Sequence, residues 1–97
     1  MAINGKWRYE DLTWPEMNEA VEAGLIPVLP VGTMEQHGPH LPVQVDSRLA
    51  TEVSHRAAQK AHNEQATVVL PVVWAGLSEH HMPFGGTITL ALALIPL

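Results

Sequence analysis

The sequence contains no cysteine. A disulfide framework and a thiolate zinc site are therefore both excluded, and any bound metal ion must be held by histidine, aspartate or glutamate. Positive charge is also scarce, because five Lys and Arg residues against ten Asp and Glu residues give a formal net charge of −5. The basic residues form no stripe that could follow a phosphate backbone, so we expect no nucleic-acid partner.

Charged residues make up only 15% of the 97 residues, whereas hydrophobic residues make up 46%. This balance excludes a disordered polymer and predicts a globular chain that forms one domain, 1–97, without an internal boundary. Its most apolar segment, TITLALALIPL at the end, would be about 16 Å long as a helix, too short for a bilayer core of about 30 Å. We therefore expect no membrane partner. The first residues, MAINGKWRYEDL, lack the apolar core of a signal peptide, which favours a cytoplasmic protein.

Helical and strand patterns alternate along the chain. Thr13 and Glu16 form a capping-box pattern and Gly24 supplies a left-handed stop, which together predict a helix between them. The predicted elements, in chain order, are a helix over 14–23, a strand over 25–31, an amphipathic helix over 47–62, a strand over 66–74 and a third candidate strand over 87–95. This order predicts an α/β fold with a parallel sheet.

The connection PVGTMEQHGPHLPVQVD, residues 30–46, follows the first predicted strand. In open α/β sheets, binding sites form outside the carboxyl ends of the strands. Glu35 and His37 are two residues apart and would face the same side of an extended segment while Gln36 points away, and Asp46 lies at the junction with the next helix. One imidazole and two carboxylates are suitable ligands for Zn²⁺, Mn²⁺ or Mg²⁺.

Each of these three side chains also has a purely structural explanation. Asp46 could be only the N-cap of a helix that starts at Ser47. Glu35 could be a solvated loop carboxylate, and His37 a hydrogen-bonded structural imidazole. The clustering of the three in a loop whose path is set by glycine and proline favours an ion site, but spacing alone leaves both explanations open.

Two segments resemble the creatininase (creatinine amidohydrolase) family. LPVGTMEQHGPHLPVQVD is similar to the family signature, which runs Leu-Pro-Val-Gly-Ser, one variable residue, Glu-Gln-His-Gly-Pro-His-Leu-Pro and then an Asp. WAGLSEHHMPFGGTITL, 74–90, is similar to the second conserved block, a Gly-x-Ser-x-Glu-His run followed by Phe-Pro-Gly-Thr, and LTWPEMNEAVEAG resembles the family's opening helix. The resemblance covers nearly the whole chain to about residue 90.

This resemblance implies a metal-dependent amidohydrolase that hydrolyses a small cyclic or linear amide with water activated by two divalent ions, Zn or Mn, with Mg as a further option. It also implies a three-layer α/β fold with a mostly parallel sheet flanked by helices, and a homo-oligomer, often a hexamer. Carried over by position, Glu35 would bind one ion, His37 the other, and Asp46 would bridge them. No residue of the chain is expected to be a catalytic group beyond these metal ligands.

Other polar residues are expected around the site rather than on the metal, as second-shell or pocket residues. They are His40, Ser78, Glu79 and His80. Adjacent His80 and His81 would point to opposite sides of an extended segment, so at most one should join Glu35 and His37. Ser78 is not expected to be a nucleophile, because no acid or histidine follows His81. His55 and His62, on the second predicted helix, are expected to be solvated.

The chain also departs from the family pattern. Family proteins are longer, and their remaining ligands, a His and a Glu after a later strand and a more distal Glu, have no counterpart here. We therefore expect an N-terminal fragment that is inactive alone. By the same resemblance, the segment between Gly76 and Gly86 is shorter than in creatininase proper, which argues against creatinine as the substrate. The alternative is a catalytically incomplete α/β remnant with only a structural or interaction role.

Overall fold

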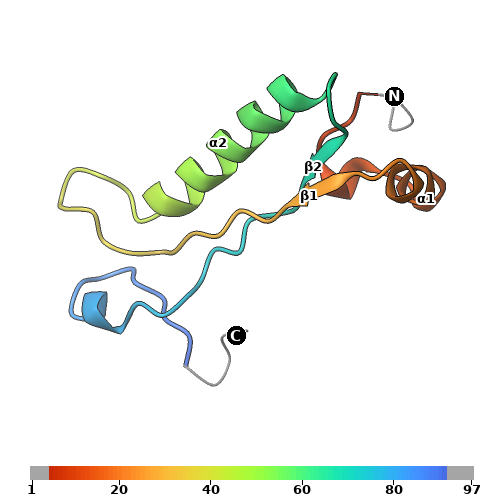
Figure 1. The fold of residues 1–97 in the computed structure, drawn as a ribbon. Helices are drawn as coiled ribbons and strands as arrows, with labels where there is room; N and C mark the ends of the chain where they lie inside the picture. The colour runs from red at the N-terminus through yellow and green to blue at the C-terminus, as the bar shows by residue number, and fades with distance from the viewer. Residues whose placement is uncertain (1–4, 92–97) are drawn as a thin grey trace. The chain divides into compact units, whose positions relative to one another are not determined.

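A computed structural model describes residues 5–91 of the chain (Figure 1). Its elements are η1 (Tyr9–Asp11), α1 (Trp14–Glu22), β1 (Ile26–Val28), α2 (Val45–Ala61), β2 (Thr67–Val69) and η2 (Glu79–His81). The chain divides into two compact units, Met1–Pro30 with Thr51–Pro71 and Val31–Ala50 with Val72–Leu97.

The first unit contains the parallel strand pair that the sequence predicts. In β1 and β2, Ile26 pairs with Thr67, and Val28 pairs with Val69. Each strand has only three residues, fewer than the predicted spans of 25–31 and 66–74. Prolines flank or interrupt these runs and cannot donate to a strand ladder, which explains the short pairing. The predicted parallel arrangement is confirmed, and the predicted strand lengths are wrong.

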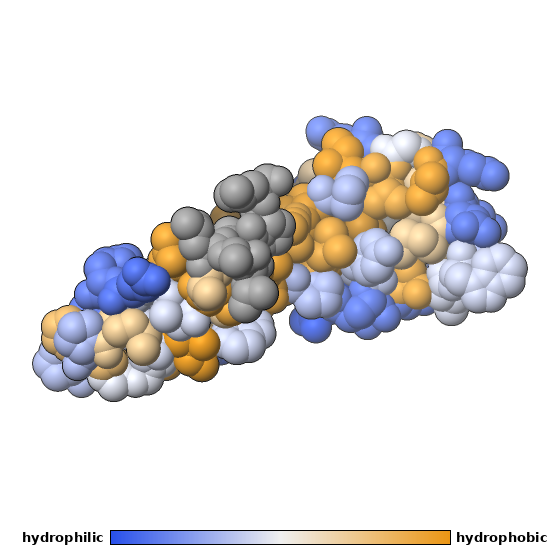
Figure 2. Space-filling model, turned by 90° about the horizontal axis from the view of Figure 1, so that it is seen from below, coloured by the Kyte–Doolittle hydropathy of each residue, from blue (hydrophilic) through white to orange (hydrophobic). Residues whose placement is uncertain are grey.

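The core of the first unit is small. Ala20 of α1 and Val68 of β2 are buried together, and Leu12 and Leu25 pack against them. Large hydrophobic side chains are exposed elsewhere in the chain, and orange residues cover much of the face drawn in Figure 2. Exposed apolar surface of this kind is typical of surfaces that pack against further protein. Within residues 5–91, no helix is long and apolar enough to cross a membrane.

Helix α1 begins with the predicted capping box. The Glu16 backbone N–H donates to Thr13 Oγ1 at 3.4 Å, and the Thr13 N–H donates to Glu16 Oε1 at 2.9 Å. Lys6 Nζ also donates to Glu16 Oε1, at 2.8 Å. This bond from Lys6, followed by the bond from the Thr13 backbone, lowers the pKa of Glu16 from 4.5 to about 2. Glu16 therefore stays ionised in the folded chain down to strongly acidic pH.

We expect Glu16→Gln to weaken the dependence of folding stability on acidic pH. Because the folded-state pKa lies below the unfolded value, the stabilisation from ionised Glu16 is fully present above about pH 4.5 and is lost as the pH falls toward about 2. Urea unfolding across this range should show a smaller loss of stability for Glu16→Gln than for the unmodified chain. Glu22→Gln, at the exposed end of α1, is the matched control. Identical pH profiles for all three proteins would contradict the assignment.

Two histidines associated with α2 differ from the prediction that they are solvated. Trp7 Nε1 donates to His55 Nδ1 at 2.9 Å, a contact across 48 residues of sequence. Both ring nitrogens of His62 are buried and have no hydrogen-bond partner among the described residues. Helical periodicity identifies the face of a residue but not the distant segment that covers it, so the prediction for both side chains is wrong.

The second unit is held together by isolated bridges. Val31 pairs in parallel with Val73, and the Gly32 N–H donates to Val73 O at 2.7 Å. Ile88 bridges Met34 in the antiparallel sense, and Thr89 bridges Gly76 in parallel. In its described part, the candidate strand over 87–95 therefore contributes only these two bridges, and its residues from 92 onward lie outside the described residues.

Candidate metal centre

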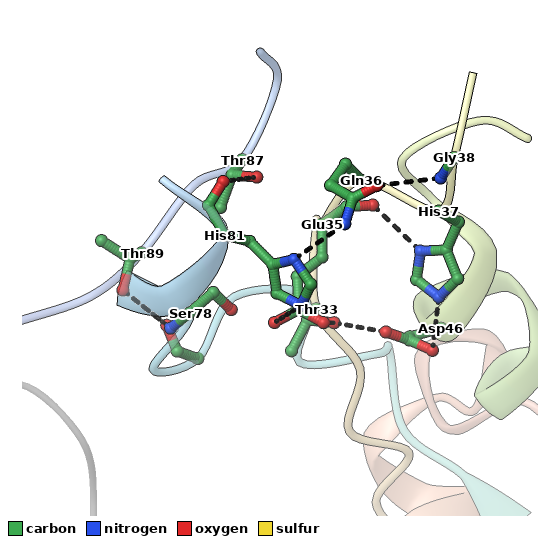
Figure 3. Close-up of polar contacts among 11 residues, drawn as sticks. Thr33, Glu35, Gln36, His37, Gly38, Asp46, Ser78, His81, Thr87 and Thr89 are labelled. Atoms are coloured by element: carbon green, nitrogen blue, oxygen red, sulfur yellow. Dashed lines mark hydrogen bonds and ion pairs between the residues drawn. The ribbon is translucent and has the colours of Figure 1, made fainter. Parts of the chain in front are cut away.

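The loop after residue 31 is held against the start of α2 by a close contact. A Cβ on Gly32 would lie 2.5 Å from Ser47 Cα, so only glycine fits at this position. Ser47 Oγ donates to Thr33 O at 2.8 Å and fixes the next residue of the loop. This contact places the polar side chains of the loop beside Asp46, as Figure 3 shows.

Asp46 does not occupy an N-cap position. Helix α2 begins at Val45, so Asp46 lies within its first turn, and the explanation of Asp46 as only the cap of a helix starting at Ser47 is wrong. Its Oδ2 accepts from Thr33 Oγ1 at 2.7 Å, and its Oδ1 lies 3.4 Å from His37 Nε2. The hydrogen bond from Thr33 lowers the pKa of Asp46, and the nearby His37 lowers it further. Asp46 is therefore ionised at neutral pH.

Thr33 connects the two carboxylates of the loop and the helix. Its Oγ1 lies 3.0 Å from Glu35 Oε1 and 2.7 Å from Asp46 Oδ2. A hydroxyl group carries one hydrogen and can donate to only one of these oxygens at a time. Two carboxylates that share one donor repel each other, and a cation bound between them would relieve this repulsion.

His37 is held in a defined tautomer. Its Nδ1 lies 3.1 Å from the backbone carbonyl oxygen of Glu35, which can only accept, so Nδ1 carries a hydrogen. In the neutral ring, Nε2 then presents a lone pair toward Asp46 Oδ1, 3.4 Å away. Two acceptors facing each other require a proton or a cation between them. In line with this, the pKa of His37 is raised, first by the bond to the Glu35 carbonyl and then by Asp46.

A second group of ligand atoms includes Glu35. Glu35, His80 and His81 each offer one atom, and these atoms lie within 4.8 Å of one another. The two histidines were expected to point to opposite sides of an extended segment, but Glu79–His81 forms the 3₁₀-helix η2, and both offer a ligand atom near Glu35 in a group that does not include His37. The His80 and His81 ring centroids are consequently only 4.1 Å apart.

His81 is the residue that the sequence analysis missed. Its Nε2 lies 4.0 Å from Glu35 Oε2, and its Nδ1 lies 3.2 Å from Gln36 Nε2. The Gln36 side chain points toward His81 (Figure 3). No local pattern in the sequence indicates this contact, because Gln36 and His81 lie 45 positions apart.

The four residues expected around the site have different environments. Ser78 is fully buried, its backbone N–H donates to Thr89 Oγ1 at 2.8 Å, and its own Oγ has no partner among the described residues. His40, Glu79 and His80 are exposed. Of these four, only His80 offers a ligand atom near Glu35.

The sequence and the fold are similar to those of known proteins. Residues 10–95 match the family model described as Creatininase, creatinine amidohydrolase. The chain is 38% identical over 69 residues to a mycofactocin precursor peptide peptidase of Mycobacterium tuberculosis, covering 65% of this chain and 28% of that protein. It is 36% identical over 77 residues to a creatinine amidohydrolase of Pseudomonas putida, covering 78% and 28%. A solved creatininase variant of Zn-Zn type matches with a TM-score of 0.75 and 35% identity, covering 88% and 34%.

The structural match confirms the predicted α/β fold class with a parallel sheet flanked by helices. The chain spans about 28% of the length of these two curated relatives. A match over this share of the relatives does not show the activity of a full-length protein.

Proposed function

Because this chain belongs to the creatininase family, we propose that it supplies part of the metal centre of an amidohydrolase. The observation that carries the proposal is the convergence of three possible ligands: Thr33 Oγ1 lies between the carboxylates of Glu35 and Asp46, and His37 Nε2 lies 3.4 Å from Asp46 Oδ1. The proposal treats residues 1–97 as the N-terminal part of one creatininase-like domain, with further ligands supplied from outside it.

The donor set fits divalent cations. Glu35, His37 and Asp46 offer carboxylate oxygens and one imidazole nitrogen, which suit Zn²⁺ or Mn²⁺, with Mg²⁺ as a further option. In the proposal, Glu35 would hold one ion and His37 a second, and the Asp46 carboxylate would serve both. Bound ions would polarise an amide carbonyl and activate water for its hydrolysis. A solved structure of the family has the Zn-Zn type, which supports zinc for this centre.

The neighbouring residues of the chain prepare these ligands. The Glu35 carbonyl holds the proton of His37 on Nδ1 and so leaves Nε2 free to bind a cation. Thr33 Oγ1 lies within hydrogen-bond distance of one oxygen of each carboxylate, Glu35 and Asp46, and its single hydrogen can orient one of them at a time. The chain's own contribution to the reaction is therefore to orient three ligand groups.

The proposed substrate is a small molecule with a cyclic or linear amide bond. The names of two relatives specify creatinine and a precursor peptide as their substrates. The proposal therefore names the bond that is hydrolysed, an amide, and no single substrate. The proposal includes assembly of the full-length protein as a homo-oligomer, with a hexamer as the expected form.

Calorimetric titration of the metal-free chain with Zn²⁺ and Mn²⁺ tests the proposal. We expect saturable but loose binding and no amide hydrolysis by this chain alone, because three ligands leave two ion positions incomplete. Absence of any saturable binding would refute the metal centre and favour a structural or interaction role. Sub-micromolar binding of two ions, or metal-dependent amide hydrolysis, would refute the need for ligands from outside the chain.

A further inference from the structure

The side chain of Gln36 has a defined orientation. The backbone N–H of Gly38 lies 2.9 Å from one end of the Gln36 amide, and an N–H group can only donate. That end must therefore be the oxygen, Oε1. The amide nitrogen, Nε2, is then the atom that lies 3.2 Å from His81 Nδ1.

This orientation determines the tautomer of His81. Because Gln36 Nε2 can only donate, His81 Nδ1 must accept. The single proton of the neutral ring is then on Nε2, the atom that lies 4.0 Å from Glu35 Oε2. Both side chains are largely shielded from solvent, with exposed fractions of 23% for His81 and 12% for Glu35.

His81 and His37 thus carry their protons on different ring nitrogens, and they present different groups to the centre. His37 carries its proton on Nδ1 and presents a lone pair, the form of a metal ligand. His81 presents Nε2–H to a carboxylate, the form of a hydrogen-bond donor. Binding a metal through His81 Nε2 would require the ring proton to move to Nδ1. Nδ1–H would then face the Gln36 amide hydrogens, so that two donors would oppose each other and the hydrogen bond would be lost.

We propose that His81 is a positioning residue for Glu35 and that Gln36 holds it in this role. The inference rests on the proposed function of Glu35 as a metal ligand. Thr33 Oγ1 lies 3.0 Å from Oε1 of Glu35, whereas His81 Nε2 is the neighbour of the other oxygen, Oε2, at 4.0 Å. A shift of about 1 Å brings Nε2 and Oε2 to hydrogen-bond distance. Ligating carboxylates are commonly held by such hydrogen bonds, whose loss costs about 10–100-fold in metal affinity.

Long-range ¹H–¹⁵N spectra of the imidazole rings, recorded on the metal-free full chain at mildly alkaline pH, test the tautomers directly. We expect the proton of His81 on Nε2 and that of His37 on Nδ1. In Gln36→Glu, the new carboxylate can accept from both Gly38 N–H and His81, so the His81 proton should move to Nδ1. A His81 proton on Nδ1 in the unmodified chain would overturn the inference.

Calorimetric titration with Zn²⁺ tests the consequence for binding. We expect His81→Phe and Gln36→Leu to weaken binding about 10–100-fold, because each removes the arrangement that presents Nε2–H to Glu35 and neither adds a charge or a ligand atom. The matched control, Gln59→Leu, makes the same change at an exposed position of α2 and should bind Zn²⁺ as the unmodified chain does. Circular dichroism checks that each variant is folded, and Gln36→Leu serves if His81→Phe is not.

The outcomes separate this inference from the proposed function. If Glu35→Gln abolishes Zn²⁺ binding while both His81→Phe and Gln36→Leu retain full affinity, Glu35 is a ligand and the role of His81 is refuted. If the unmodified chain does not bind Zn²⁺, the proposed function fails, and the positioning role fails with it.

Discussion

Asp46→Asn is expected to weaken Zn²⁺ or Mn²⁺ binding by at least about 100-fold, because even the loss of a hydrogen-bond partner behind a ligand costs about 10–100-fold. The substitution removes the negative charge that Asp46 places 3.4 Å from His37 Nε2. The fold should tolerate the change. The new amide oxygen can still accept from Thr33, and the new amide nitrogen can donate to the lone pair on His37 Nε2.

Calorimetric titration gives the affinity of the Asp46→Asn variant, and urea unfolding without metal gives its stability. Asp11→Asn is the matched control, because Asp11 is the only other aspartate in the sequence and lies in η1 of the first unit. Unchanged affinity in Asp46→Asn would remove Asp46 from the metal centre. Equal losses of affinity in the two variants would mean that the ions bind to general negative charge rather than to this site.

Features specified by neighbouring residues could be predicted from the sequence. The start of α1 follows from Thr13 and Glu16, three residues apart, and the structure contains both hydrogen bonds of the capping box. The parallel pairing of β1 and β2 follows from two apolar runs separated by a helix. The capping box and the order of the apolar runs depend on the spacing of residues along the chain, and this spacing can be read directly from a sequence.

Contacts between distant residues could not be predicted in the same way. The clustering of Glu35, His37 and Asp46 suggested a site, but not that one hydroxyl, from Thr33, would lie between the two carboxylates. The contact between Gln36 and His81 joins residues 45 positions apart. It depends on the short helix η2, whereas the prediction for His80 and His81 assumed an extended segment.

The early start of α2 shows how a small error in an element boundary changes a functional interpretation. A helix starting at Ser47 would make Asp46 a cap, for which Asn is nearly as good as Asp. A helix starting at Val45 places Asp46 in the first turn, where its carboxylate is bonded by the loop instead. Helix ends are the least certain part of a sequence-based assignment, and here the difference separates a structural role from a ligand.

Thr33→Val is expected to destabilise the metal-free chain by about 1–3 kcal/mol, the cost of leaving polar groups without their donor. Valine keeps the size of the side chain but removes the hydroxyl that contacts Glu35 Oε1 at 3.0 Å and Asp46 Oδ2 at 2.7 Å. The two carboxylates then face each other with no hydrogen between them. Thr33→Ser is the control, because it retains the hydroxyl and should lose much less stability.

Saturating Zn²⁺ distinguishes this explanation from a simple packing effect. If the carboxylates of Glu35 and Asp46 bind a cation, the ion takes over the charge compensation that the hydroxyl provides without it. The stability deficit of Thr33→Val, measured by urea unfolding, should therefore be smaller with Zn²⁺ than without. A packing defect at Thr33 would cost the same in both conditions. An equal deficit with and without Zn²⁺ would show that the hydroxyl and the cation do not act on the same pair of carboxylates, and the shared centre would have to be abandoned.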